Sequence, residues 1–264
     1  MQECLNEIIH LIVDICTCNG RLPLSNIEFA FNYRHGPSSE SQTKNVVQHF
    51  KNKRPGETTT KFSFYSADEL YQYIIAQKYI GIHRGPYFHF KHNDSKERSN
   101  LFIHNPQPLI FDIDGTDYAH IRSCKCGKEK KVCNDCWEEC IIPAIDAVFT
   151  LCIQLGFRHG DIIFSGRRGV HIYVTDAKVW YLCYDQRKMI VDRILNAGVI
   201  IDSDVTLKLA HLTKAPMFYH PDTGNICMPI TKEWRPEGGA VHYLKATKEQ
   251  IQGWIKQLRT SLVW

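Results

Sequence analysis

The segment that most constrains the fold is a pair of apolar runs joined by a charged link. The runs are DIIFSG at 161–166 and VHIYVTD at 170–176, and the link between them is GRRG. Two such runs around a glycine-flanked turn predict antiparallel strands in a hairpin. Because arginine is seldom buried unpaired, both arginines of the link belong at the tip of this hairpin. We therefore expect a sheet with positive charge at one end.

The composition is that of a globular protein. Of 264 residues, 44% are apolar and 23% are charged, which excludes a disordered, collagen-like or coiled-coil chain. The net charge of +4 is too small to establish a polyanionic partner. The first eighteen residues lack the basic start and unbroken apolar run of a signal peptide, and no apolar run is long enough to span a membrane. We therefore expect an intracellular protein with no membrane partner.

A second apolar run ends in two carboxylates. The sequence PLIFDID, which begins at Pro108, predicts a buried strand whose last residues emerge at the sheet edge. Asp112 and Asp114 alternate along this strand, so their side chains point to the same face. Such a pair suits hard cations such as Mg²⁺ or Mn²⁺, and two ions about 3.5–4 Å apart can organise a nucleotidyl transfer. A solvated strand end is the alternative explanation for an isolated pair.

Four of the eleven cysteines are crowded into one segment with the spacing C-x-C-x6-C-x2-C. These four are Cys124, Cys126, Cys133 and Cys136. Two close pairs of thiolates fit a tetrahedral Zn²⁺ site in a reducing compartment, and reduced free thiols are the alternative. The other cysteines are expected to be ordinary core or surface residues: Cys4, Cys16, Cys18, Cys140, Cys152, Cys183 and Cys227.

Basic residues surround the cysteine group. They are Arg122, Lys125, Lys128, Lys130 and Lys131. This local charge is compatible with a nucleic-acid contact and equally with a solvated structural zinc loop.

The hairpin link and two later segments supply candidate phosphate ligands. In SGRRGVH, the glycines allow a close backbone approach and the guanidiniums bind phosphate oxygens, whereas an exposed basic turn is the alternative. The candidate ligands there are Ser165, Arg167, Arg168 and His171. In IDSDVT, Asp202 and Asp204 form a second same-face pair on a strand that we expect over 199–205. In HLTKAPMFYHPDTG, Lys214 and His220 are candidate donors to phosphate or sugar, or else ordinary surface residues.

The order of these motifs resembles the catalytic small subunit of archaeo-eukaryotic DNA primases. The matching motifs are FDIDGTDY, the cysteine group ending in CW, SGRRGVH, IDSDVT and HLTKAPMFYHPDTG, and they span Pro108 to Ile230. The resemblance implies an α+β fold with mixed β-sheets flanked by helices. It also implies one catalytic domain over residues 1–264, with a zinc knuckle inserted at 122–137.

The same resemblance implies roles for individual residues. Asp112, Asp114 and Asp202 would bind two catalytic Mg²⁺ or Mn²⁺ ions, with Asp204 ranked below Asp202. The incoming nucleotide would be bound by Ser165, Arg167, Arg168, His171, Lys214 and His220. The structural Zn²⁺ would be held by Cys124, Cys126, Cys133 and Cys136.

The implied activity is synthesis of short RNA primers, without a pre-existing primer, on a single-stranded DNA template. The implied partners are ribonucleoside triphosphates, that template, and a primase large subunit or replicative helicase and polymerase proteins, and the implied location is the nucleus. Two rivals remain: a primase-polymerase or repair polymerase that uses deoxynucleotides, and a non-catalytic, zinc-bearing subunit that binds single-stranded DNA. A third, an RNA- or protein-binding module with an incidental zinc knuckle, leaves the two aspartate clusters unexplained.

The chain also departs from the family pattern. Where the family has an arginine after its F-S-F segment, this sequence has Gln72 or Tyr73, and Arg84 is a possible substitute. The short connection before Asp202 leaves no room for the helical subdomain of cellular primases. In this brevity the chain is similar to the late-expression-factor primases of insect large DNA viruses, for which the location would be the host nucleus.

Overall fold

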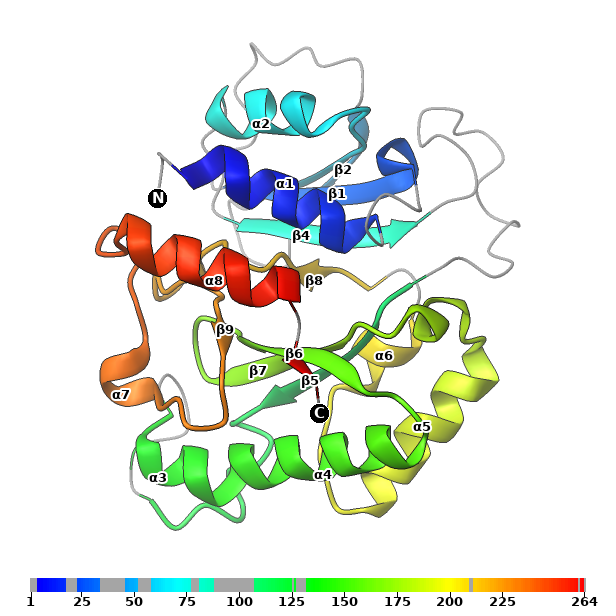
Figure 1. Cartoon of the computed structure of the whole chain (residues 1–264), viewed down its shortest axis with the longest axis vertical. Helices are drawn as coiled ribbons and strands as arrows, with labels where there is room; N and C mark the ends of the chain where they lie inside the picture. Colours follow the sequence, from blue (N-terminus) through cyan, green and yellow to red (C-terminus); the bar gives the residue numbers. More distant parts are fainter. Residues whose placement is uncertain are drawn as a thin grey trace.

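The computed structural model describes residues 4–17, 23–33, 46–51, 58–76, 81–87, 107–124, 126, 132–208, 211–260 and 262–263. The described strands form two β-sheets, one in each half of the molecule in Figure 1. None of the described helices is long and apolar enough to cross a membrane. Cys18 and the lysines beside the cysteine group, Lys125, Lys128, Lys130 and Lys131, lie outside the described residues.

The first sheet lies in the upper half of Figure 1 and is built mostly from the N-terminal part of the chain. Its strand order is β2 (Val46–Lys51), β3 (Thr58–Phe62), β1 (Ile27–Tyr33), β4 (Gly81–Tyr87) and β8 (Thr213–Lys214). The helices of this half are α1 (Leu5–Cys16), the short η2 (Leu24–Asn26) and α2 (Ala67–Ala76). The strand β8 comes from much later in the chain, so it ties residue Lys214 to the N-terminal half.

A cluster of aromatic rings packs α2 against the first sheet. Tyr73 of α2 lies 4.9 Å from Phe31 and 4.6 Å from Phe62, measured between ring centroids. Tyr73 is therefore a core residue and does not replace the family arginine. Gln72 is exposed, and Arg84 lies in β4, where its side chain is outside the described part. Ser66 caps α2, because its Oγ accepts a 3.1 Å hydrogen bond from the Glu69 backbone N–H.

The second sheet contains the hairpin predicted from the sequence. Its order is β10 (Leu262–Val263), β6 (His159–Phe164), β7 (Gly169–Val174) and β5 (Leu109–Asp114), and β9 (Pro229–Ile230) also pairs with β6. Alternation along these strands sorts the side chains onto two faces. Phe164 on one face contacts Trp137 of the helical layer, with ring centroids 6.2 Å apart. Asp112 and His171 lie on the opposite face, where they are cross-strand partners.

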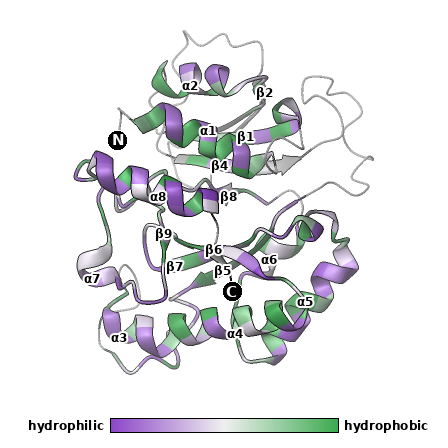
Figure 2. Cartoon of the chain, in the orientation of Figure 1, coloured by the Kyte–Doolittle hydropathy of each residue, from purple (hydrophilic) through white to green (hydrophobic). Residues whose placement is uncertain are grey.

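Helices cover the outer side of the second sheet (Figure 1). They are α3 (Asn134–Cys136), the π-helical η4 (Trp137–Ile141), α4 (Ile142–Gln154), the short η5 (Ala177–Tyr181), α5 (Tyr184–Asn196) and α6 (Ser203–Leu207). After β9 come α7 (Pro236–Gly239) and α8 (Lys248–Thr260). Figure 2 shows α4 largely in hydrophobic colours and α8 in mixed colours, and each of these helices buries one face and exposes the other.

The expected α+β fold is confirmed, with two corrections. Every pairing between described strands is antiparallel, so the sheets are not mixed. The strand expected over 199–205 is absent: this fully described segment turns into α6, because Asp202 caps the helix by accepting a 3.0 Å hydrogen bond from the Asp204 backbone N–H. Asp202 and Asp204 therefore do not share a strand face.

Candidate functional site

The candidate site lies on the face of the second sheet that turns away from α4. At its centre are Asp112 and Asp114, at alternate positions of β5. On the neighbouring strand β7, Asp112 is paired with His171 and Asp114 with Gly169. A Cβ at Gly169 would lie 2.1 Å from the Ile113 carbonyl oxygen, so only glycine allows the two strands to approach this closely. The hairpin tip is thereby held against the carboxylates.

Asp112 is a largely buried carboxylate among other carboxylates. Burial, with the nearby charges of Asp114 and Asp202, raises the pKa of Asp112 to about 7. His171 Nε2 lies 3.7 Å from Asp112 Oδ1, beyond hydrogen-bond distance. Burial, followed by the charge of Lys214, lowers the pKa of His171 to about 3, so this imidazole supplies no positive charge at neutral pH. Asp112 is thus left with a charge that a cation would stabilise.

Asp114 is stabilised as an anion by donors on both sides. Arg168 Nε donates to its two carboxylate oxygens at 2.8 and 3.0 Å. The backbone N–H and the hydroxyl of Thr116 each donate to Oδ1 at 2.8 Å. Burial alone would raise the pKa of Asp114, but these hydrogen bonds outweigh it and the pKa is lowered. Asp114 is therefore negatively charged at neutral pH.

Asp202 reaches the site through the backbone of its own segment. Its N–H donates to the carbonyl oxygen of Asp112 at 3.0 Å. The following helix is fixed to the same strand, because Thr206 Oγ1 donates to the Ile110 carbonyl at 2.8 Å. Asp204 instead pairs with Lys208 at 2.5 Å on the exposed surface. The structure therefore brings Asp202 beside Asp112 and leaves Asp204 in a surface ion pair.

Fully buried Arg187 anchors the helices behind these aspartates. Its guanidinium donates to the carbonyl oxygens of Gln107 at 2.7 Å and of Pro108 at 3.1 Å, immediately before β5. It also reaches the Thr206 carbonyl at 3.5 Å. Because each of these bonds joins α5 to the site segments, Arg187 fixes the relative position of β5 and α6.

The hairpin link that carries Arg167 and Arg168 and the loop that carries His220 pack against each other as one unit. Gly166, at the start of the hairpin link, has φ +82°, and a Cβ there would lie 2.8 Å from both His220 Cβ and the Asn225 carbonyl oxygen. Thr223 Oγ1 donates to the Gly166 carbonyl at 2.6 Å, and Asp222 pairs with Arg167 at 3.3 Å. The sequence predicts phosphate ligands in each of these two segments independently, and the structure brings the segments together.

Ser165 and Lys214 complete the set of predicted anion ligands. Ser165 Oγ accepts a 3.2 Å hydrogen bond from the Gly169 N–H, which closes the hairpin link. Lys214 lies on β8 opposite His83 of β4. Burial lowers the pKa of Lys214, while the negative charge of Asp112 opposes that shift. Lys214 is therefore a largely buried cation within the electrostatic reach of the aspartates.

Sequence reasoning missed His83, Asp222 and Thr223. Thr223 and Asp222 are inside a motif that was selected, and the turn residues T-G after His220 could have indicated a hydrogen-bonded loop. His83 had no such signal. It joins the site only because β4 pairs with β8, which no local pattern predicts.

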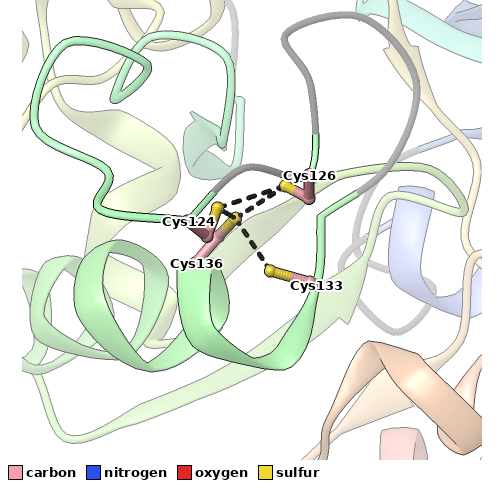
Figure 3. Close-up of side chains that lie close together, drawn as sticks. All are labelled: Cys124, Cys126, Cys133 and Cys136. Carbon is pink, nitrogen blue, oxygen red and sulfur yellow. Dashed lines mark hydrogen bonds between the residues drawn. The ribbon is translucent and has the colours of Figure 1, made fainter.

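The four cysteines converge at the start of the helix that begins at Asn134 (Figure 3). Their Sγ atoms all lie within 4.8 Å of one another, and Cys136 Sγ is 2.8 Å from Cys124 Sγ and 3.3 Å from Cys133 Sγ. Arg122 Nη1 lies 3.7 Å from Cys136 Sγ, so a positive charge adjoins the sulfur atoms. The thiols fit a metal ion that prefers sulfur ligands.

The aspartates form a looser group. Across the described ranges, the cysteines are the only set of three or more His, Cys, Asp or Glu side chains with all ligand atoms within 4.8 Å. Asp112, Asp114 and Asp202 interact electrostatically without meeting that limit, as expected for carboxylates that repel each other and of which one is bound by Arg168. Their oxygen atoms are still of the kind that hard divalent cations prefer. A bound cation would also compensate the unfavourable charge of Asp112.

Comparison with known proteins identifies relatives of the central part of the chain. Residues 111–198 match the family model described as DNA primase small subunit. The DNA primase small subunit of Drosophila melanogaster is 35% identical over 114 residues, which are 43% of this chain and 26% of that protein. The DNA primase small subunit of Pyrobaculum arsenaticum is 31% identical over 138 residues, 52% of this chain and 42% of that protein. The chain thus spans less than half the length of these relatives.

Among solved structures, the polymerase domain of Mycobacterium tuberculosis Ligase D in complex with DNA aligns with a TM-score of 0.46 and 14% identity. The alignment covers 86% of this chain and 81% of that one. The stretch that matches the family, 111–198, contains the β5 aspartates, the cysteine group and the hairpin link, whereas Asp202, Lys214 and His220 lie beyond it.

Proposed function

We propose, from the relationship of residues 111–198 to the small subunit of archaeo-eukaryotic DNA primases, that this chain is a primase catalytic subunit. It would transfer nucleotides onto a growing RNA chain on a single-stranded DNA template, starting without a primer. The observation that carries this proposal is the convergence of Asp112, Asp114 and Asp202 with the arginine and histidine segments on one sheet face. Carboxylates next to phosphate ligands are what metal-dependent nucleotidyl transfer requires.

The aspartates would hold the catalytic ions. Two Mg²⁺ or Mn²⁺ ions bound there would activate the attacking 3′-hydroxyl and stabilise charge on the α-phosphate. Of the three carboxylates, Asp112 has the charge that its surroundings stabilise least, so it should gain most from a bound cation. Asp202 is positioned by its backbone bond to β5 and by the cap of α6, and its charge acts on Asp112.

The arginine and histidine segments would bind the triphosphate. Arg167 and Arg168 lie at the hairpin tip, and the loop that carries His220 is bonded to that tip through Thr223. Ser165 and His171 flank the same turn, and Lys214 approaches from the other sheet. The proposed contribution of these groups is to position the triphosphate and to stabilise the charge of the leaving pyrophosphate.

The four cysteines would hold a structural Zn²⁺, apart from the reaction. The remaining proposed partners are the single-stranded DNA template, ribonucleoside triphosphates and a primase large subunit or other replication proteins. The family relationship supports these partners, because small subunits of this family act together with a larger one.

A primer-synthesis assay tests the proposal. The whole chain is incubated with Mn²⁺ or Mg²⁺, single-stranded DNA and labelled ribonucleoside triphosphates, and the products are separated by length. We expect oligoribonucleotides from the unchanged chain and at least a 10³-fold loss in Asp112→Ala. Asp204→Ala is the matched control, because this aspartate is in a surface pair with Lys208 and its loss should leave synthesis nearly unchanged.

The same assay separates the rival functions. Synthesis from deoxynucleotides in preference to ribonucleotides would identify a deoxynucleotide-using polymerase of the same superfamily. Binding of single-stranded DNA with no synthesis, with or without a large subunit, would identify a non-catalytic replication subunit and contradict the proposal.

A further inference from the structure

Two buried histidine nitrogens, one on a strand of each sheet, have no hydrogen-bond partner in the described part of the chain. They are Nδ1 of His83 on β4 and Nδ1 of His171 on β7, and neither contacts a donor or acceptor in the described residues. Buried polar atoms are nearly always paired, so unpaired ones indicate a missing partner. The two rings come from different sheets and interact electrostatically with each other and with Lys214.

His83 is placed beside Lys214 by strand pairing. It lies on β4 and is the direct cross-strand partner of Lys214 on the edge strand β8. The neighbouring backbone is fixed, because the Ala215 N–H donates to the Ile82 carbonyl at 3.1 Å. This pairing fixes the backbone of His83 beside Lys214. No local pattern in the sequence indicates that position.

We propose that His83 forms a hydrogen bond with a sugar hydroxyl of the incoming nucleoside triphosphate and so determines sugar specificity. This inference rests on the proposed function and assigns a residue that recognises the sugar of the nucleotide. The cationic groups of the site, Arg167 and Arg168, lie at the hairpin tip and suit the phosphates. His83 lies instead on the other sheet, as the direct partner of Lys214, so the proposal places the sugar on the Lys214 side of the nucleotide.

The chemistry of the ring supports a hydroxyl over a phosphate. Burial, followed by the charges of Lys214 and His211, lowers the pKa of His83 to about 4, so the ring is neutral at physiological pH. A neutral imidazole has one donor and one acceptor nitrogen and can pair with a hydroxyl in either direction. Without a charge, it attracts a triphosphate less strongly than Arg167 and Arg168 do. A site that pairs with a substrate hydroxyl discriminates against the analogue that lacks it.

The test measures equilibrium binding and single-nucleotide incorporation for ATP, 2′-deoxy-ATP and 3′-deoxy-ATP. Three variants of the whole chain are compared with the unchanged chain. His83→Phe removes the hydrogen bond but keeps a ring, whereas His83→Asn keeps a donor and acceptor near the position of Nδ1. His10→Asn, at an exposed position of α1, is the matched control.

We expect His83→Phe to weaken binding of ATP about tenfold or more. Binding of the deoxy analogue that lacks the contacted hydroxyl should change less than about twofold. We expect His83→Asn to recover part of the loss. Equal losses with all three nucleotides, or no loss with any, would overturn the role of His83. Nucleotide binding without any synthesis by the unchanged chain would contradict the proposed function, and the binding ratios would still decide the role of His83.

Discussion

Arg168 donates from Nε to both carboxylate oxygens of Asp114, at 2.8 and 3.0 Å. This pair joins the tip of the hairpin to the end of β5. In the proposed reaction the same guanidinium also meets a triphosphate, so Asp114 and the phosphates compete for it. A divalent cation bound by Asp114 would end the competition, because it replaces the positive charge that Arg168 supplies. Cation binding and triphosphate binding are thus expected to favour each other.

Loss of Arg168 should affect nucleotide binding and catalysis together. We expect Arg168→Ala to lower kcat/KM for the nucleotide by about 10²–10³-fold, because one cationic ligand of the transition state is lost. Arg168→Lys should remain impaired, since an ammonium cannot replace the planar guanidinium. Steady-state kinetics at varied nucleotide and Mn²⁺ concentrations measure the effect. Arg193→Ala, on the exposed surface of α5, is the control, and an equal loss there would refute the assignment.

Asp112 should make the stability of the metal-free protein depend on pH. Burial and the neighbouring carboxylates raise its pKa to about 7 in the folded chain, against about 3.9 in the unfolded chain. Between these values the folded state binds more protons, so its free energy of unfolding decreases as pH rises from about 4 to 7. Asp112→Asn removes this cost, which at roughly 1.4 kcal/mol per pKa unit gives a gain of about 2–4 kcal/mol at pH 8.

Urea denaturation at pH 4, 6 and 8, in buffer free of Mg²⁺ and Mn²⁺, measures this gain. It should be small at pH 4 and largest at pH 8. Asp192→Asn, which breaks only an exposed pair with Lys188, should show no comparable trend. If Asp112→Asn raises the free energy of unfolding by the same amount at all three pH values, the charge of Asp112 does not destabilise the folded protein.

The local patterns in the sequence predicted the parts of the site that lie within single elements. Alternation placed Asp112 and Asp114 on one face of a strand, and the glycines of the link predicted the hairpin turn. The strand expected over 199–205 is wrong because Asp202 caps a helix that begins at Ser203, which ends the extended segment. Asp202, three residues before the short run that begins at Val205, is a helix-start signal in the sequence.

Contacts between distant segments could not be predicted in this way. His83 meets Lys214 only through the register of β4 with β8, and Thr223 meets Gly166 only because two loops pack together. Neither contact leaves a periodic or compositional signal, because each depends on which strands and loops become neighbours. The expectation of mixed sheets failed for the same reason, since strand direction depends on connections that the local sequence does not encode.

The cysteine group should be required for stability and not for the chemistry itself. We expect Cys136→Ser to reduce zinc from about one ion per chain to nearly none and to lower the melting temperature, because structural zinc contributes folding free energy directly. Elemental analysis and thermal melting measure the two effects. Cys183→Ser is the matched control, because that residue caps α5 and serine caps a helix at least as well. Unchanged zinc content in Cys136→Ser would contradict the assignment.

The interlock between the hairpin link and the His220 loop should be measurable with two glycine variants. Gly166 and Gly198 have nearly the same backbone conformation, with φ of +82° and +81°. A Cβ at Gly198 would meet nothing within 4 Å, whereas one at Gly166 would lie 2.8 Å from His220 Cβ. Both alanine variants should therefore lose about 1–2 kcal/mol of stability from backbone strain. Only Gly166→Ala should also displace His220, raising KM for the nucleotide about tenfold. Because the strain is matched, equal KM values in the two variants would show that the two loops do not act as one binding unit.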